Sequence, residues 1–181
     1  MTAWRVRHAV SGDAGSIAHT HVLAWRQTYP GIVPAVTLAK LSVENRTLFW
    51  RRVLEIPEPR TRVFVGEDGT GTIVGFGVCG PERVGLRDYQ GEFHAIYLVR
   101  AAQGRGLGSR LMGTMARAML DQGMAAASVW VLRDNRRARR FYQGLGGQPV
   151  AERPLNFDGT EVTEVSYGWR DLPRFPSGRQ P

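Results

Sequence analysis

The spacing of apolar and polar positions predicts one strand and two helices at the start of the chain. Residues 4–9 alternate between apolar and polar side chains, which is typical of a strand with one buried face. From residue 14 to residue 25, apolar positions recur every three or four residues, as on one face of a helix. Ser42 is placed to cap a second helix, whose predicted inner stripe comprises Val43, Thr47, Trp50 and Leu54.

The rest of the chain predicts a series of strands with two further helices. Two short turns, one over 68–71 and one at Asp158-Gly159, separate β-rich segments and predict hairpins. The predicted strands cover 61–67, 72–80, 92–99, 126–132, 148–157 and 160–169, with helices starting in 104–108 and covering 135–143. The order β-α-α-β-β-β-α-β-α-β-β indicates one α/β (α+β) domain with a mostly antiparallel sheet.

The predicted domain covers residues 1–171, and the proline- and arginine-rich segment 172–181 is interpreted as a loose tail. Hydrophobic residues make up 43% of the 181 residues, enough for the core of one domain. The N-terminus has no apolar segment typical of a signal peptide, and no stretch approaches the roughly 18 apolar residues of a membrane span. We therefore expect a cytoplasmic protein without a membrane partner.

The charge and the metal-ligand side chains narrow the function classes. The formal net charge is +8, from 24 basic and 16 acidic residues, with one dense basic cluster at 133–140. Such a surface suits nucleic acid, an anionic cofactor or solubility alone. Cys79 is the only cysteine, which excludes an internal disulfide and a cysteine-based zinc site, and the four histidines are scattered. We expect no metal site.

Three glycines at 104, 106 and 108, between a predicted strand and a predicted helix, are typical of a phosphate-binding turn. A P-loop requires a lysine after its last glycine, and Ser109 stands there. A Rossmann fingerprint requires G-x-G-x-x-G directly after a strand of a βαβ unit, whereas the spacing is G-x-G-x-G among hairpin-connected strands. Both nucleotide-binding interpretations are therefore excluded.

The remaining interpretation is the pattern Q/R-x-x-G-x-G, met by Gln103, Gly106 and Gly108. Together with the downstream residues Asn135, Ala138, Tyr142 and Gly146, in the spacing N-x-x-A-x-x-x-Y-x-x-x-G, this resembles the GCN5-related N-acetyltransferase (GNAT) superfamily. The resemblance covers about residues 3–170. It departs from the family pattern at Arg100, where proline is common, and at Gly147, where an aromatic residue is common.

The resemblance implies a mixed sheet of six to seven strands flanked by four helices, with a splay between strands four and five. It implies acetyl-CoA as cosubstrate, its pantetheine arm against the fourth strand and its pyrophosphate on the glycine turn. A backbone N–H near Leu98 would face the thioester carbonyl. The cofactor-binding residues that it implies are Ile96, Tyr97, Leu98, Gln103, Gly104, Arg105, Gly106, Leu107, Gly108, Ser109, Asn135 and Tyr142.

Two catalytic roles follow from the resemblance. Tyr142 is the predicted general acid for the thiolate, with simple packing as the alternative. Glu92 is the predicted base for the amine, with an ordinary strand-end carboxylate as the alternative and His94 as a second candidate. Period-two alternation would place Glu92, His94, Ile96 and Leu98 on one strand face.

The acceptor is predicted less sharply than the donor. Trp25, Tyr29 and His94, with Trp50, are candidates for the acceptor wall, although aromatic residues at helical spacing are more often core. The predicted activity is acyl-CoA-dependent N-acyl transfer, most simply of acetyl, to a small-molecule or protein amine. The alternative is a non-catalytic acyl-CoA sensor or interaction module. We expect no nucleic-acid partner, and a homodimer is compatible with the sequence.

Overall fold

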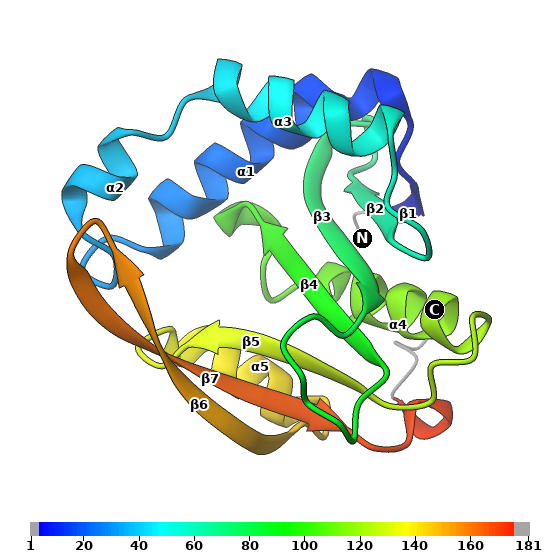
Figure 1. Cartoon of the computed structure of the whole chain (residues 1–181). Helices are drawn as coiled ribbons and strands as arrows, with labels where there is room; N and C mark the ends of the chain where they lie inside the picture. Colours follow the sequence, from blue (N-terminus) through cyan, green and yellow to red (C-terminus); the bar gives the residue numbers. More distant parts are fainter. Residues whose placement is uncertain (1–3, 176–181) are drawn as a thin grey trace.

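The computed structural model describes residues 4–175 and contains seven strands and five α-helices within them (Figure 1). The strands are β1 (Arg5–His8), β2 (Arg62–Glu67), β3 (Ile73–Pro81), β4 (Gly91–Leu98), β5 (Ala127–Leu132), β6 (Gln148–Phe157) and β7 (Thr160–Trp169). The helices are α1 (Ala14–Thr28), α2 (Ala35–Ala39), α3 (Val43–Glu55), α4 (Leu107–Leu120) and α5 (Arg136–Gly144). Every predicted strand is present, and the short α2 is the one α-helix in addition to those predicted.

The strands form one sheet in the order β1-β2-β3-β4-β5-β7-β6. All neighbouring pairs are antiparallel except β4 and β5, which confirms the predicted mixed, mostly antiparallel sheet. The parallel pair is short: its register runs only from Gly91 opposite Ala127 to Phe93 opposite Val129. Beyond this point the two strands separate, as Figure 1 shows, and the predicted splay is confirmed.

Helices cover both faces of the sheet. The α4-side core contains the inner residues of α4 and α5, including Leu111, Met115 and Tyr142, packed with Phe93 of β4. The α1-side core contains Ile17 of α1 and neighbouring residues of α3, β2 and β3. The two helical layers are therefore separated by the sheet, and a ligand that passes between β4 and β5 would meet both.

The second predicted helix has the expected cap but a narrower inner stripe. Ser42 Oγ accepts a hydrogen bond from the Asn45 N–H at 3.2 Å, which confirms the N-cap of α3. Trp50 is buried in the α1-side core, whereas Val43 is 39% exposed because it lies at the first position of the helix. The prediction that Val43 belongs to the inner stripe was wrong, because its side chain is exposed.

The α2 helix is tied to the tip of the β6–β7 hairpin. Asp158 and Gly159 both have positive φ, and this confirms the predicted turn. The Asp158 carboxylate accepts from Thr37 Oγ1 and Lys40 Nζ, each at 2.5 Å. In Figure 1 this hairpin tip lies beside α2, so that α2 and the hairpin border the same end of the sheet.

Beyond β7, the chain continues in the core rather than leaving the fold. Leu172 and Phe175 are only 1% and 8% exposed, and both belong to the α4-side core. The packed chain therefore extends past the predicted boundary at residue 171 at least to Phe175. The rest of the predicted tail, 176–181, lies outside the described residues.

Candidate active site

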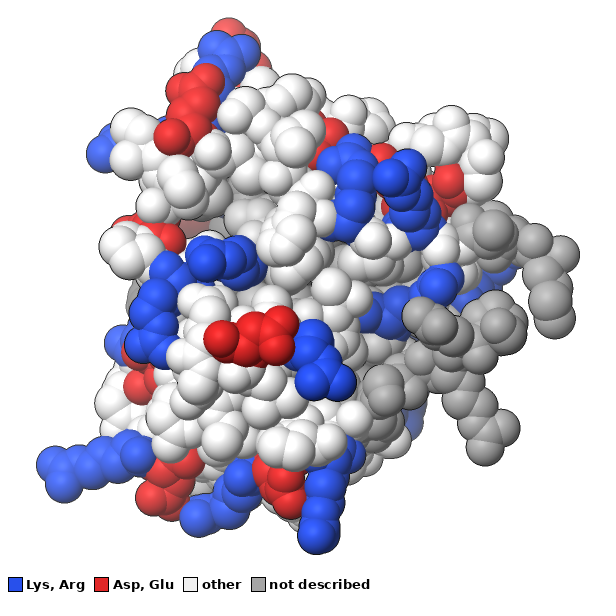
Figure 2. Space-filling view, turned by 90° about the vertical axis from the view of Figure 1, so that its right-hand side faces the viewer, with Lys and Arg blue, Asp and Glu red and all other residues white. Residues whose placement is uncertain are grey.

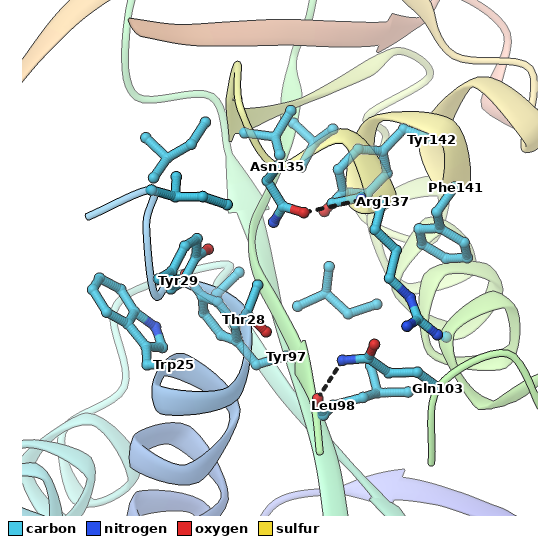
Figure 3. A pocket seen from close by; sticks show the side chains of 18 of the residues that line it. Trp25, Thr28, Tyr29, Tyr97, Leu98, Gln103, Asn135, Arg137, Phe141 and Tyr142 are labelled. Atoms are coloured by element: carbon cyan, nitrogen blue, oxygen red, sulfur yellow. Dashed lines mark hydrogen bonds between the residues drawn. The ribbon is translucent and has the colours of Figure 1, made fainter. Parts of the chain in front are cut away.

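A cavity of about 790 Å³ lies where β4 and β5 separate. It is lined by β4 from His94 to Leu98 and by β5 from Val129 to Leu132, and it continues to α1, α5 and the glycine turn. In Figure 3, Trp25 and Tyr29 lie on one side of β4, and Phe141 and Tyr142 lie on the other. The cavity therefore passes through the sheet, with one mouth on each helical layer.

Most of the sequence-predicted site residues line this cavity. The structure brings together Trp25, Tyr29, His94, Ile96, Tyr97, Leu98, Gln103, Gly104, Gly106, Gly108, Ser109, Asn135 and Tyr142. Glu92, Arg105, Leu107 and Trp50 are outside its lining. Most of the predicted site residues therefore lie together in one cavity. The four residues outside it each lie elsewhere for a physical reason.

A β-bulge in β4 changes which side chains share a face. Val78 of β3 is opposite Ala95 and Cys79 is opposite Phe93, so His94 has no partner of its own. Consequently Phe93 packs in the α4-side core and Ala95 against the α1-side core, although they are two residues apart. The predicted single face of Glu92, His94, Ile96 and Leu98 was therefore wrong, because Ile96 and Leu98 point toward the α4-side core.

The β4 backbone presents free donors to the gap. The Val99 N–H donates to Val74 O of β3 at 3.0 Å, in the register that pairs Phe76 with Tyr97. Because hydrogen bonding alternates along an antiparallel ladder, the N–H groups of Ile96 and Leu98 are directed away from β3 and toward β5. At this depth β5 has already separated from β4, so these N–H groups face the cavity.

The glycine turn is built for close approach by a bulky anion. Gly104 and Gly106 have φ of +73° and +89°, and Gly106 is the N-cap of α4. A Cβ at Gly108 would lie 3.2 Å from the Phe141 ring, so this glycine permits α4 and α5 to approach each other. The free N–H groups and the dipole of the α4 N-terminus favour an anion at this position. Gln103 Nε2 donates to Leu98 O at 2.9 Å and fixes the turn on β4.

Leu107 and Arg105 of the same turn point elsewhere. The Leu107 side chain is fully buried in the α4-side core, which leaves only its backbone to face a ligand. The Arg105 guanidinium lies over the Trp4 ring at 5.5 Å, and its carbonyl accepts from Trp4 Nε1 at 2.7 Å. These contacts attach the glycine turn to Trp4, which precedes β1, and the Arg105 side chain does not line the cavity.

Three other arginines give the cavity its positive charge: Arg100, Arg136 and Arg137. The basic cluster at 133–140 is divided, since Arg133 pairs with Glu152 and Arg139 donates to Tyr167 Oη at 3.1 Å. On the face drawn in Figure 2, lysine and arginine side chains lie in separate groups with acidic side chains between them. The residues present at the α4 mouth therefore fit a phosphate-bearing ligand such as coenzyme A.

Asn135 and Tyr142 come from the two ends of α5. The Asn135 Oδ1 accepts from the Ala138 N–H at 3.1 Å, so Asn135 caps α5 while it also lines the cavity (Figure 3). Tyr142 is 5% exposed and lines the same cavity. Burial raises the pKa of the Tyr142 phenol well above its ordinary value, so the phenol is protonated at neutral pH.

Glu92 lies behind the cavity rather than in it. Its carboxylate is 2% exposed and pairs with Arg83, whose Nη2 lies 2.5 Å from Glu92 Oε1. The Arg83 backbone N–H also donates to Glu92 Oε2, at 3.1 Å. Because β4 and β5 are still paired at Glu92, no gap opens beside it. The structure thus does not bring Glu92 together with the other predicted site residues.

His94, the second candidate base, does line the cavity. Its Nε2 lies 2.9 Å from Pro81 O, and because a carbonyl only accepts, this nitrogen carries the proton. The Nδ1 atom of the neutral ring is then the basic nitrogen. Burial lowers the pKa of His94, and the charge of Arg83 lowers it further, while Glu92 and Glu58 raise it. The imidazole is therefore neutral at pH 7 and able to accept a proton.

The mouth on the α1 side is aromatic. Trp25 and Tyr29 of α1 contact each other with ring centroids 4.8 Å apart, and Tyr97 and Phe157 lie around them. Burial raises the pKa of Tyr29 and of Tyr97. Trp50 is not part of this wall, because its Nε1 donates to His21 Nδ1 at 3.2 Å inside the α1-side core. The suggestion of Trp50 as an acceptor residue was therefore wrong.

Sequence reasoning missed several cavity residues, among them Glu164 of β7. The others include Gln27, Thr28, Ile32, Arg100, Trp130, Arg137, Phe141 and Phe157. Glu164 lies between Thr163 and Val165 in β7, whose other inward-facing positions are uncharged. A carboxylate at such a position is the sequence signal that could have identified it as a site residue. Because Glu164 is far from the glycine turn in the sequence, the sequence alone did not place it in the site.

The remaining chemistry-bearing groups give no second centre within the described residues. Burial raises the pKa of the Cys79 thiol to about 12, so the thiol is protonated at neutral pH. Within residues 4–175, no cluster of three or more His, Cys, Asp or Glu side chains is placed to hold a metal ion. In the same range, the helices are too short or too polar to cross a membrane.

Comparison with known proteins agrees with this geometry. The chain is 36% identical over 168 residues to the uncharacterized N-acetyltransferase YuaI of Bacillus subtilis, covering 92% of this chain and 93% of that protein. It is 35% identical over 139 residues to an uncharacterized N-acetyltransferase of Archaeoglobus fulgidus, covering 76% and 88%. Among solved structures, yncA of Salmonella typhimurium with its cofactor acetyl-CoA has a TM-score of 0.69 at 19% identity, covering 99% of each chain.

A second solved structure is the PaiA N-acetyltransferase of Thermoplasma acidophilum in complex with coenzyme A. Its TM-score is 0.66 at 17% identity, and the match covers 90% of this chain and 98% of that one. Residues 22–146 match the sequence profile of the acetyltransferase (GNAT) family. That stretch contains the splayed strand β4, the glycine turn and Tyr142. The chain therefore belongs to the acetyltransferase (GNAT) family of N-acetyltransferases.

Proposed function

We propose that the protein transfers an acetyl group from acetyl-CoA to a primary amine, by direct attack while both substrates are bound. The observation that carries the proposal is the cavity through the sheet, with a glycine turn at one mouth and an aromatic wall at the other. Two substrates that enter from opposite faces would meet in the gap between β4 and β5. The solved relatives that hold acetyl-CoA or coenzyme A support the choice of donor.

The donor would occupy the mouth on the α4 side. The α4 N-terminus, with Arg136 and Arg137, would hold the phosphates, and the free N–H groups of β4 would bind the pantetheine arm like an added strand. One of these two N–H groups, at Ile96 or Leu98, would donate to the thioester oxygen while the other holds the arm. Fixed donors of this kind stabilise the negative charge that develops on that oxygen as the amine attacks.

Two side chains would move the protons. His94 Nδ1 accepts a proton from the attacking amine, directly or through one water, as the C–N bond forms. As the C–S bond breaks, the electron pair goes to sulfur, and the Tyr142 phenol donates its proton to the thiolate. Proton exchange with solvent then restores both side chains. Glu92 takes no direct part in this scheme, since its carboxylate lies outside the cavity.

A thiol-release assay tests the function. Purified protein with acetyl-CoA and a panel of primary amines is expected to release free coenzyme A, with the acetylated amine identified by mass spectrometry. Tight coenzyme A binding by calorimetry with no release for any amine would instead support the non-catalytic acyl-CoA sensor. The cytoplasmic location and the homodimer expected from the sequence stay predictions.

The glycine turn gives a further prediction with a matched control. At φ of +89°, alanine in place of Gly106 costs about 1–2 kcal/mol or forces the turn to relax. We expect Gly106→Ala to raise the KM for acetyl-CoA by about tenfold, the ratio that ~1.4 kcal/mol gives. Gly85→Ala carries the same strain at φ of +90° in a loop away from the cavity, and its KM is expected to match that of the wild type. Equal KM values for both variants and the wild type would contradict the assignment of the turn.

A further inference from the structure

The α1-side mouth of the cavity combines aromatic rings with a single carboxylate. Trp25 and Phe157 approach edge to face with centroids 6.4 Å apart, and Tyr29 approaches Tyr97 in the same way at 6.4 Å. Trp25 and Phe157 are half-buried, so their outer faces are open to a ligand. A ring surface of this kind favours a flat or large apolar body over a small or strongly hydrated one.

Glu164 supplies the carboxylate. It is opposite Leu132 in the β5–β7 register, and Leu132 is buried with Tyr29 in the cluster behind the aromatic wall. Arg153 Nε donates to Glu164 Oε2 at 2.9 Å, while Oε1 accepts no hydrogen bond from the described residues. The Glu164 side chain is only 15% exposed, so an ammonium beside Oε1 would be largely shielded from water.

Arg153 holds this carboxylate in place from outside the cavity. Its guanidinium lies over the Trp130 ring at 4.3 Å and is not part of the cavity lining. A carboxylate that is fixed by one partner and has one free oxygen has room for one cation.

The other charges around the cavity do not favour a second cation on the acceptor. Apart from Glu164, the acidic side chain in the lining is Asp134, which is exposed in the turn between β5 and α5. Arg100 lines the cavity at its α1 end, where its Nη2 donates to Gln27 O at 2.6 Å, and would repel a second ammonium group. A polyamine or aminoglycoside would therefore leave ammonium groups without partners.

From this arrangement, and resting on the proposed function, we infer that the acceptor is a primary amine on an aromatic body with no second cationic group. Glu164 binds its ammonium group, and Trp25, Tyr29 and Phe157 hold the apolar body. Glu164 is therefore a specificity residue of the acceptor site. The bound ammonium first loses one proton to solvent, which frees its lone pair, and His94 takes the second proton as the C–N bond forms. The function of Glu164 is therefore binding.

The test compares phenethylamine with ethylamine, which lacks the ring, and with spermidine, which has additional cationic groups. We expect the KM for phenethylamine to be at least about tenfold below the KM of either competitor. Glu164→Gln keeps a hydrogen-bond acceptor for Arg153 but removes the charge. This variant is expected to raise the KM for phenethylamine by about tenfold or more, with little change in kcat or in the KM for acetyl-CoA.

Two control variants and a binding measurement complete the design. Glu161→Gln changes an exposed carboxylate near the start of β7 and should leave all constants unchanged. Phe157→Ala, on the half-buried hairpin, should reduce the advantage of phenethylamine over ethylamine, and an unchanged KM for acetyl-CoA would show that it folds. Calorimetry measures phenethylamine binding to the protein saturated with coenzyme A, independently of turnover.

Each outcome bears on the inference. A lower KM for spermidine than for phenethylamine, or equal KM values in Glu164→Gln and Glu161→Gln, would overturn it while leaving the acetyltransferase function intact. Phenethylamine binding that depends on Glu164 without any thiol release would support the acceptor site and overturn the proposed reaction. Neither binding nor release of thiol with phenethylamine, when spermidine is acetylated, would overturn the acceptor inference alone.

Discussion

Tyr142→Phe is expected to lower kcat by about a hundredfold, at the lower end of what a positioned general acid contributes. The KM for acetyl-CoA should be nearly unchanged, because the ring that lines the cavity is retained. Burial raises the pKa of the phenol, so the phenol keeps its proton until the thiolate departs and can then donate it.

Tyr167→Phe is the matched control for this prediction. Tyr167 is 1% exposed, its ring centroid lies 6.3 Å from that of Tyr142, and it is absent from the cavity lining. Removing its hydroxyl loses a hydrogen bond from Arg139 and should lower the free energy of unfolding by about 1 kcal/mol, with kcat preserved. Wild-type kcat in Tyr142→Phe would mean that Tyr142 is a packing residue and that the thiolate is protonated by another group.

The donor half of the site could be predicted because its signals are local in sequence. Gln103, Gly106 and Gly108 lie within six residues, and Asn135 and Tyr142 lie at the two ends of one helix. The two departures from the family pattern also have local explanations in the structure. The Arg100 N–H donates to Gln27 Oε1 at 2.7 Å, which proline could not do. A Cβ at residue 147 would lie 2.8 Å from the Trp169 ring.

The acceptor half could not be predicted in the same way, because it depends on pairing between distant strands. The bulge at His94 exists only in the β3–β4 register, and alternation within one strand cannot reveal it. The bulge reverses the face of the sheet to which the side chains after Phe93 point. Glu92 and His94 therefore do not share a face with Ile96 and Leu98. Glu164 reaches the cavity because β7 inserts between β5 and β6, so its role depends on the sheet order. Local signals thus define the donor, and topology defines the acceptor.

His94→Gln is expected to lower kcat by about a hundredfold and to remove the acid limb of the pH profile of kcat. Glutamine can still donate to Pro81 O, so the strand geometry is kept while the basic Nδ1 is lost. In the wild type, the pKa of His94 lies below its ordinary value of 6.5. The kcat should therefore be constant above pH 6.5 and should decrease at lower pH, as His94 becomes protonated. The profile is measured at saturating concentrations of both substrates, where it reports groups in the ternary complex.

The ion pair behind His94 distinguishes the two candidate bases. The Glu92 carboxylate raises the pKa of His94 and the Arg83 guanidinium lowers it. If His94 is the base, Glu92→Gln keeps most of kcat and moves the acid limb to lower pH, whereas Arg83→Gln moves it to higher pH. If Glu92 is the base, Glu92→Gln removes kcat and His94→Gln does not. Opposite shifts of the acid limb in the two variants require a titrating group that both Glu92 and Arg83 face. Loss of the buried ion pair alone would not produce opposite shifts.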